Sequence, residues 1–130
     1  MVSAGPLTHP AVVNEFLKNH LEDKDREYFV ALLLDIRNKV LAVHHVSIGT
    51  LNSTLITPRE LFKAAILVGA ASVILAHNHP SGDPLPSLED IETTRNLAAA
   101  GKIIGIQVLD HIIVGEYCVS LRDRGFMEPA

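Results

Sequence analysis

The sequence predicts an α/β fold in which a mixed β-sheet is flanked by helices. Helix-like and strand-like segments alternate along the chain in the approximate order αββαβαβββ. Two of the strands are joined by a short polar turn, which is typical of an antiparallel hairpin. Other strands are separated by helical segments, which is typical of a sheet covered by helices.

The N-terminal part of the chain predicts a leader followed by one helix. Residues 1–9 are expected to be a loose leader. The helix is expected to begin at Pro10, because proline suits the first helical position and apolar residues then recur at helical spacing as far as Leu21. The charged segment 22–26 is expected to end this helix.

A hairpin and a second helix are predicted next. The continuous apolar run Tyr28–Leu34 is typical of a strand buried on both faces. Residues 35–38 are the expected turn, and Val40–Ile48 is the expected returning strand. Thr57, followed by proline and then glutamate, is typical of a capped helix start, and that helix is expected to run to about Gly69.

The second half of the chain predicts a short strand, a helix and three further strands. The short strand is Ser72–Ala76. The helix is expected to begin at Ser87, to run to about Ala100 and to be closed by Gly101, since glycine commonly ends helices. Three strand-like segments complete the chain: Ile103–Leu109, Ile112–Val114 and Tyr117–Leu121.

Composition, charge and cysteine content exclude several classes of function. No apolar run among the 130 residues approaches the roughly 20 that a membrane-spanning helix needs, and no signal peptide is evident, so a cytoplasmic location is expected. The net charge is −4 and basic residues are scattered, so direct contact with nucleic acid is not expected. Cys118 is the only cysteine, which excludes a thiolate cage for zinc.

Residues 77–90 carry the pattern that points to a metal site. His77 and His79 are two residues apart at the end of a predicted strand, so their side chains point to the same side. A proline-rich and glycine-rich loop follows and can turn the next helix back toward them. Asp90, in the first turn of that helix, would be the third ligand. Two histidines and one carboxylate leave a tetrahedral position open, as in catalytic zinc sites.

Each of these residues also has a structural alternative. Ser87 and Asp90 are spaced as a capping box, and an aspartate is favoured near the positive end of a helix. The two histidines could be ordinary residues at the end of a strand. The combination of a His-x-His pair, a rigid loop and a carboxylate at a helix start favours the metal site over three separate coincidences.

The same residues resemble a known signature. His-x-His, seven residues, then Ser-x-x-Asp is typical of the JAMM metalloproteases, also called MPN-plus domains, and is present as His77, His79, Ser87 and Asp90. The strings LAHNHPSGDPLPSLEDIETTR, LDHIIVG and VSIGTLNSTLITPRELFKAAI resemble the bacterial RadC-like branch more closely. This resemblance covers nearly the whole chain.

The resemblance implies a three-layer domain over residues 10–126, with an arrangement similar to that of the cytidine deaminases. It implies one Zn²⁺ ion held by His77, His79 and Asp90, and hydrolysis of an amide in a peptide or isopeptide whose identity the sequence does not reveal. Members of the branch usually carry an additional N-terminal region resembling a helix-hairpin-helix module, so this chain is expected to be the catalytic domain without it. A homodimer is compatible with the sequence.

The resemblance also implies two catalytic residues. The family uses an upstream glutamate as a general base, and Glu27, just before the first predicted strand, matches that position better than Glu22 or Glu15. The alternative for Glu27 is a solvated residue in a charged cluster. Ser87 would stabilise the oxyanion that develops on the attacked carbonyl, a role that competes or coexists with helix capping.

Three other polar residues near the motif have less specific patterns. Asp110 and His111 are expected between two strands, where a turn with a satisfied histidine is favoured over support of a metal ligand from behind. Asn78, between the two histidines, is expected to order the following loop through side-chain hydrogen bonds.

Three functions are therefore compared. The first is a zinc-dependent hydrolase whose extended substrate lies beside the strand that leads into His77. The second is an MPN-type binding module in which the metal is structural or lost, which the intact ligand set disfavours. The third is the DNA-repair or nuclease role that the traditional name of the RadC-like branch suggests, which the acidic charge disfavours for this domain.

Overall fold

The structure is a computed structural model, and it describes residues 10–21, 27–48 and 56–127. The predicted leader 1–9 and the charged segment 22–26 lie outside the described residues. The elements are, in chain order, α1 (Pro10–Leu21), β1 (Tyr28–Leu34), β2 (Val40–Ile48), α2 (Pro58–Val68), β3 (Ser72–Asn78), α3 (Leu88–Ile104), β4 (Gln107–Val114) and β5 (Cys118–Ser120).

The five strands form one mixed sheet in the order β2-β1-β3-β4-β5. The sequence predicted a mixed sheet but not this order. β1 pairs antiparallel with both β2 and β3, and β4 pairs antiparallel with β5. β3 and β4 are parallel because α3 connects them as a crossover helix. The predicted hairpin of β1 and β2 is confirmed.

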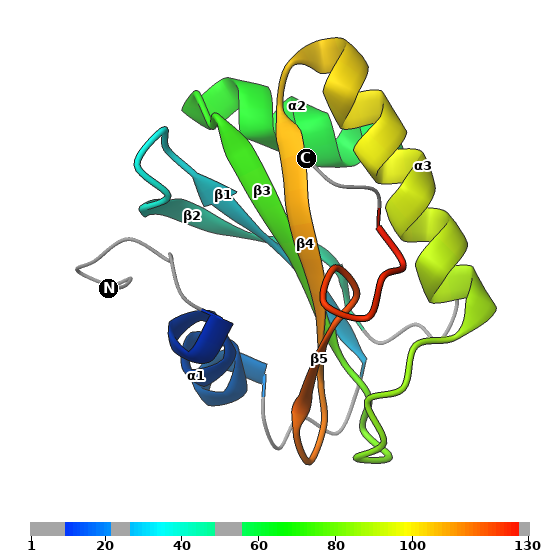
Figure 1. Ribbon diagram of the computed structural model, residues 1–130. Coiled ribbons are helices and arrows are strands. Elements are labelled where there is room, and N and C mark those ends of the chain that lie inside the picture. Colours follow the sequence, from blue (N-terminus) through cyan, green and yellow to red (C-terminus); the bar gives the residue numbers. More distant parts are fainter. Residues whose placement is uncertain (1–9, 22–26, 49–55, 128–130) are drawn as a thin grey trace.

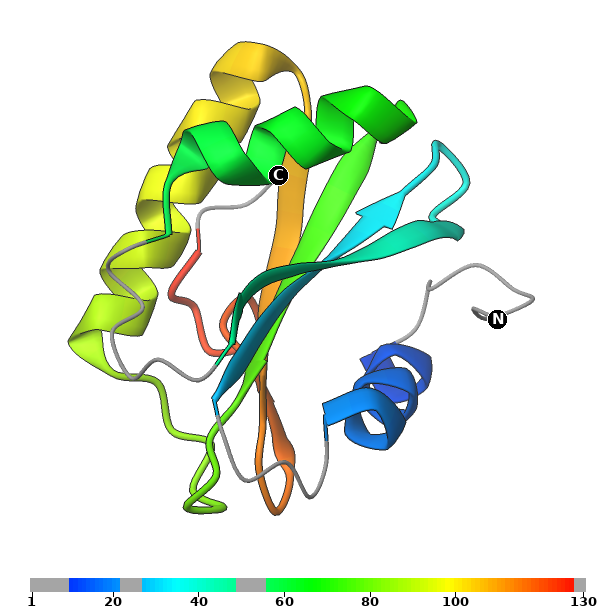
Figure 2. The same cartoon turned by 180° about the vertical axis from the view of Figure 1, so that it is seen from behind.

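Helices cover both faces of this sheet, which makes a three-layer α/β domain (Figures 1 and 2). α1 lies on one face, and α2 and α3 lie on the other. The core is divided in the same way: alternate residues of β3, such as Val73 and Ile74, belong to the two different clusters. No helix in the described part of the chain is both long enough and apolar enough to span a membrane.

The C-terminal end of α3 differs from the prediction. The helix does not stop at Ala100 but continues to Ile104, and Gly105, with φ of 90°, is its cap. Gly101 lies inside the helix, where a Cβ would stand 2.3 Å from the backbone oxygen of Ile106. Glycine is therefore needed there for the close approach of the chain entering β4, and the predicted strand beginning at Ile103 is wrong.

A second correction concerns the last strands. The two strands predicted on either side of Asp110 and His111 are one continuous strand, β4. Asp110 is accommodated within it because its carboxylate accepts hydrogen bonds from the hydroxyl of Ser120 at 2.5 Å and from the backbone of Arg122 at 3.1 Å. Asp110 and His111 therefore do not form a turn. His111 lies within β4, and its side chain is buried. The last predicted strand is also shorter than expected.

β3 is the central strand, and this position corrects the expected path of the substrate. It extends to Asn78, two residues beyond the predicted end, so His77 lies within the strand. β1 and β4 already pair with its two edges. An extended peptide therefore cannot add a strand beside β3, and the edge strands of the described sheet are β2 and β5.

Candidate metal centre

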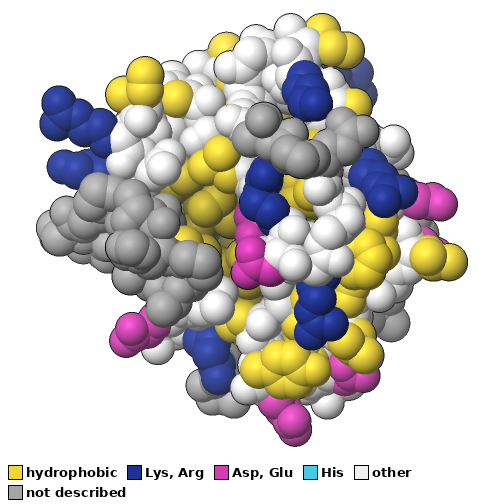
Figure 3. Space-filling model, viewed as in Figure 1, with side chains coloured by type: hydrophobic (Ala, Val, Ile, Leu, Met, Phe, Trp, Pro, Cys, Tyr) yellow, Lys and Arg dark blue, Asp and Glu magenta, His cyan; other side chains and the backbone are white. Residues whose placement is uncertain are grey.

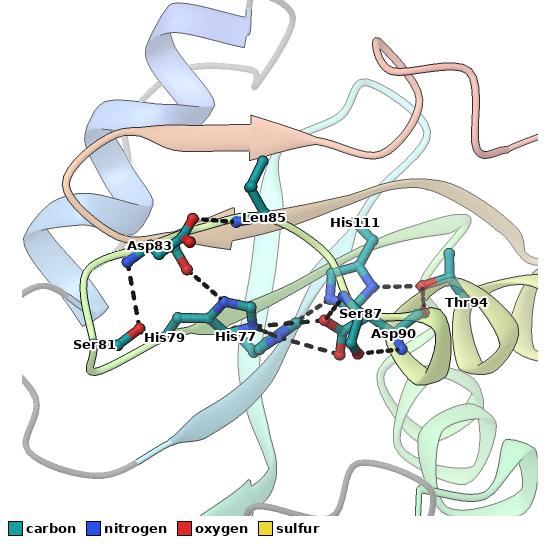
Figure 4. A network of polar contacts seen from close by, with 9 residues as sticks. All are labelled: His77, His79, Ser81, Asp83, Leu85, Ser87, Asp90, Thr94 and His111. Carbon is teal, nitrogen blue, oxygen red and sulfur yellow. Dashed lines mark hydrogen bonds and ion pairs between the residues drawn. The ribbon is translucent and has the colours of Figure 1, made fainter.

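The end of β3 brings the two histidines of the motif together (Figure 4). His77 is fully buried, and the side chain of His79, one residue beyond the strand, is 19% exposed. Their Nε2 atoms are 2.9 Å apart. Because His77 and His79 are two positions apart in the sequence, their imidazoles lie on the same side and meet there, as the strand geometry predicted.

Asp90 reaches the same point from the start of α3. Its carboxylate oxygens lie 3.5 Å from Nε2 of His77 and 3.5 Å from Nε2 of His79. The capping box is also present, because the Ser87 backbone N–H donates to Asp90 at 2.9 Å and the Asp90 N–H donates to the Ser87 hydroxyl at 3.0 Å. Capping and ligation, considered as alternatives from the sequence, are compatible in this geometry.

The three side chains could hold one metal ion. Each offers a ligand atom, and these atoms lie within 4.8 Å of one another. Nδ1 of His79 donates a hydrogen bond of 2.8 Å to the backbone oxygen of Asp83. When the ring is neutral, its Nε2 therefore carries the lone pair and presents it to the centre. A carboxylate and unprotonated imidazole nitrogens directed at one point are a suitable set of donors for a cation.

The electrostatics of the three ligands differ. Burial lowers the pKa of His77 to about 4, against the opposing effect of Asp90. The hydrogen bond to Asp90 raises the pKa of His79 above its ordinary value. Burial alone would raise the pKa of Asp90, but the hydrogen bond from His79 and the nearby His77 hold it well below its ordinary range. The carboxylate is therefore ionised, and His79 is the ligand at which a proton competes with a metal.

Glu27 lies next to this centre, immediately before β1. Burial raises the pKa of its carboxyl, with an opposing contribution from His79 and a further increase from Asp90. Asn78 fixes this region, because its Oδ1 accepts a hydrogen bond of 2.6 Å from the backbone N–H of Tyr28. The side chain of Asn78 thus holds the start of β1, and its ordering of the loop that follows stays a prediction.

Two buried residues lie behind His77, and sequence reasoning missed one of them, Thr94. His111, expected in a turn, is fully buried, and its Nε2 lies 2.7 Å from Nδ1 of His77. Thr94 contacts the other nitrogen of His111 at 2.5 Å. The support of a metal ligand that the sequence left as the less favoured alternative for His111 is thus what the geometry provides. The spacing of Asp90 and Thr94, four residues on one helix face, was the available signal.

The fold and this site together define a JAB/MPN-type domain. A family model described as the RadC-like JAB domain matches residues 7–126. The chain belongs to this RadC-like family, as the sequence resemblance indicated.

Three curated relatives show the extent of the similarity, and each is named a UPF0758 protein. The relative from Desulforamulus reducens is 56% identical over 119 residues, which is 91% of this chain and 52% of the relative. That from Desulforudis audaxviator is 63% identical over 92 residues, 71% of this chain and 40% of the relative. The relative from Methanosarcina mazei is 46% identical over 123 residues, which is 94% of this chain and 54% of the relative. The chain thus spans about half the length of these relatives.

Proposed function

We propose that this domain binds one zinc ion through His77, His79 and Asp90 and hydrolyses an amide bond in a peptide or isopeptide. The observation that carries the proposal is the convergence of two imidazoles and one carboxylate, one ligand fewer than a closed structural site has. When bound, zinc would supply a Lewis acid for the carbonyl and would lower the pKa of a water molecule. Membership in the RadC-like JAB family favours a hydrolytic reaction.

The donor set favours zinc over other common metals. Calcium and magnesium are usually bound by oxygen ligands alone, whereas this centre offers two nitrogens and one carboxylate. The burial of His77 and the ionised state of Asp90 keep both in the form that binds a metal at neutral pH.

Glu27 is the proposed general base. Two observations support this role: the charges of His79 and Asp90 both act on the carboxyl of Glu27, and Glu27 is not one of the three grouped residues. The raised pKa makes Glu27 a better proton acceptor than an exposed glutamate. In the proposed reaction Glu27 takes the proton of the attacking water and then delivers it to the leaving amine.

Ser87 is proposed to stabilise negative charge on the attacked carbonyl oxygen. Its hydroxyl oxygen accepts from the N–H of Asp90, so the hydroxyl hydrogen is still able to donate outward. The residue is exposed and stands at the N-terminus of a 17-residue helix, where the aligned peptide dipoles favour an anion. Capping and oxyanion stabilisation can therefore be carried out by one side chain.

The charge distribution supports amide chemistry over a nuclease reaction. On the face drawn in Figure 3, Lys and Arg side chains are scattered among apolar and acidic ones and form no continuous stripe. The chain as a whole carries a net charge of −4. A domain that grips a phosphate backbone needs a continuous basic stripe, so a substrate without phosphates is favoured.

Replacement of Glu27 by glutamine tests the proposed reaction. The zinc-loaded protein and its Glu27→Gln variant would be incubated with a proteome-derived peptide library, and zinc content would be measured in both. Glutamine keeps the size of the side chain but cannot take up the proton. We expect the variant to retain zinc and to lose at least about 100-fold in cleavage rate.

Three outcomes would contradict the proposal in different ways. Loss of zinc together with activity in Glu27→Gln would show that Glu27 is a ligand or a structural residue. Equal cleavage by both proteins would identify a contaminating protease. Zinc-dependent cleavage of phosphodiesters that depends on Glu27, without amide cleavage, would establish the nuclease reaction instead.

A further inference from the structure

A continuous chain of hydrogen bonds runs behind the candidate ligands (Figure 4). The hydroxyl of Thr94 donates to the backbone carbonyl of Asp90 at 2.7 Å. The same hydroxyl oxygen lies 2.5 Å from Nδ1 of His111, and Nε2 of His111 lies 2.7 Å from Nδ1 of His77. The chain therefore begins at one candidate ligand on α3 and ends at another on β3.

One arrangement of hydrogens satisfies every bond of this chain when both rings are neutral. The carbonyl of Asp90 can only accept, so the single hydroxyl hydrogen of Thr94 is committed to it. The oxygen of Thr94 must then accept from Nδ1–H of His111, which leaves Nε2 of His111 as an acceptor. That atom accepts Nδ1–H of His77. The Nε2 atom of His77 consequently keeps its lone pair, and it is the atom that faces Asp90 and His79.

The chain is shielded from solvent along its length. His77, Thr94 and His111 are all 0% exposed. Phe29 stacks on His77, with ring centroids 5.6 Å apart and planes inclined by 6°, and meets the ring of His111 edge-on at 5.3 Å. Because these groups are buried, a hydrogen-bond partner lost by mutation is not readily replaced by water. Phe29 also holds the rings of His77 and His111 in position from the side.

We propose that His111 and Thr94 are positioning residues that hold His77 in the tautomer and ring orientation required to bind the metal. A neutral imidazole binds a metal only through its unprotonated nitrogen, so the alternative tautomer of His77 would present an N–H to the centre. The hydroxyl of Thr94 also restrains the backbone carbonyl of Asp90, which couples the placement of two ligands from different elements. This inference rests on the metal site of the proposed function but not on the hydrolytic reaction.

Conservative and disruptive substitutions of Thr94 in the full 130-residue chain test the proposal. Thr94→Val keeps the shape of the side chain and removes the hydroxyl, whereas Thr94→Ser keeps the hydroxyl. Thr93→Val is the matched control, because Thr93 is a buried neighbour on the same helix and belongs to no bond of the chain. Zinc affinity would be measured by competition with a chromophoric chelator, and the tautomer of His77 by ¹⁵N NMR of the metal-free protein at neutral pH.

We expect the wild-type His77 to carry its hydrogen on Nδ1. Thr94→Val should weaken zinc binding by about 10-fold to 100-fold and introduce the second tautomer of His77, while Thr94→Ser and Thr93→Val should behave as wild type. A purely structural role of Thr94 would lower the melting temperature without changing the tautomer.

Two results would overturn the proposal. One is a wild-type His77 that carries its hydrogen on Nε2, which decides the question even if Thr94→Val does not fold. The other is a folded Thr94→Val with unchanged zinc affinity and a single His77 tautomer. Wild-type protein that binds no zinc would contradict the proposed function instead, and the tautomer measurement would still test the hydrogen-bond chain on its own.

Discussion

At the scale of single residues, the pKa values of His77 and His79 are shifted in opposite directions. His77 is buried within a strand, and burial lowers its pKa to about 4. His79 lies two residues further along and is partly exposed, and the hydrogen bond to Asp90 raises its pKa. The difference arises because only His77 lies inside the sheet, while both share the same carboxylate.

This difference predicts an acid-dependent loss of stability in the metal-free protein. The unfolded chain takes up a proton on His77 near pH 6.5, whereas the folded chain does so near pH 4. As pH falls from about 6.5 to about 4, unfolding is therefore favoured by about 3 kcal/mol through His77. The lowered pKa of His111 acts in the same direction, and the raised pKa of His79 opposes both.

Urea unfolding of the chelator-treated protein across this pH range measures the effect. The variant His77→Gln lacks the titrating group, so its free energy of unfolding should depend less steeply on pH between about 6.5 and 4. An unchanged slope in the variant would show that His77 is not the group responsible.

At the scale of elements, the loop between β3 and α3 is fastened to the β4–β5 hairpin. The backbone N–H of Glu116 donates to the oxygen of Gly82 at 2.8 Å, and the N–H of Gly82 donates to the oxygen of His79 at 2.9 Å. A Cβ at Gly115 would lie 2.4 Å from the oxygen of Gly82. The same loop supplies the carbonyl of Asp83 that orients His79, so the packing of two backbones sets the position of a candidate ligand.

Gly115→Ala is therefore expected to disturb the metal site from a distance. Because the contact is with backbone atoms, the loop must move, and we expect a loss of about 1–3 kcal/mol in stability together with weaker zinc binding. Unfolding in urea and zinc competition would be measured on the same preparation.

Gly105→Ala serves as the control for that measurement. Gly105 also resists substitution, because its φ is 90°, but nothing lies within 4 Å of the added atom and the residue is at the far end of α3. It should lose stability by about 1–2 kcal/mol and keep its zinc affinity. Equal zinc affinity in Gly115→Ala and wild type would show that the loop is not positioned by this contact.

At the scale of the whole molecule, the candidate ligands join the central strand to a helix that covers one face of the sheet. β3 is covered on both faces (Figure 1). It carries His77 and leads directly into His79, and α3 carries Asp90. A cavity of about 510 Å³ lies elsewhere, between α3, β4 and the C-terminal turn, and none of the three ligands lines it.

Metal binding should accordingly stabilise the domain as a whole. Zinc at 100 times its dissociation constant would contribute about 2.7 kcal/mol, because the site exists only in the folded chain. For a domain of this size the melting temperature should rise by roughly 10 °C, as measured by calorimetry with zinc and with a chelator. The variant His79→Ala should show a much smaller shift, and an equal shift in both proteins would locate the zinc outside this centre.

The sequence by itself determined the class of fold, most element boundaries and the three candidate ligands. Continuous apolar runs such as Tyr28–Leu34 predict strands covered on both faces, and proline after Thr57 marks a helix start, because these signals are local. His77, His79 and Asp90 were recognisable because strand alternation and helix starts constrain where side chains point.

The tertiary structure alone decided which distant residues meet. His111 is 34 positions from His77 in the chain, and their hydrogen bond exists only because β3 and β4 are parallel neighbours. The sequence could not show that Gly101 lies inside the helix and does not end it. A glycine needed because another backbone comes close looks the same in the sequence as a glycine needed for a positive φ. Which strand lies at the centre of the sheet likewise depends on pairing between segments far apart, and local patterns do not encode such pairing.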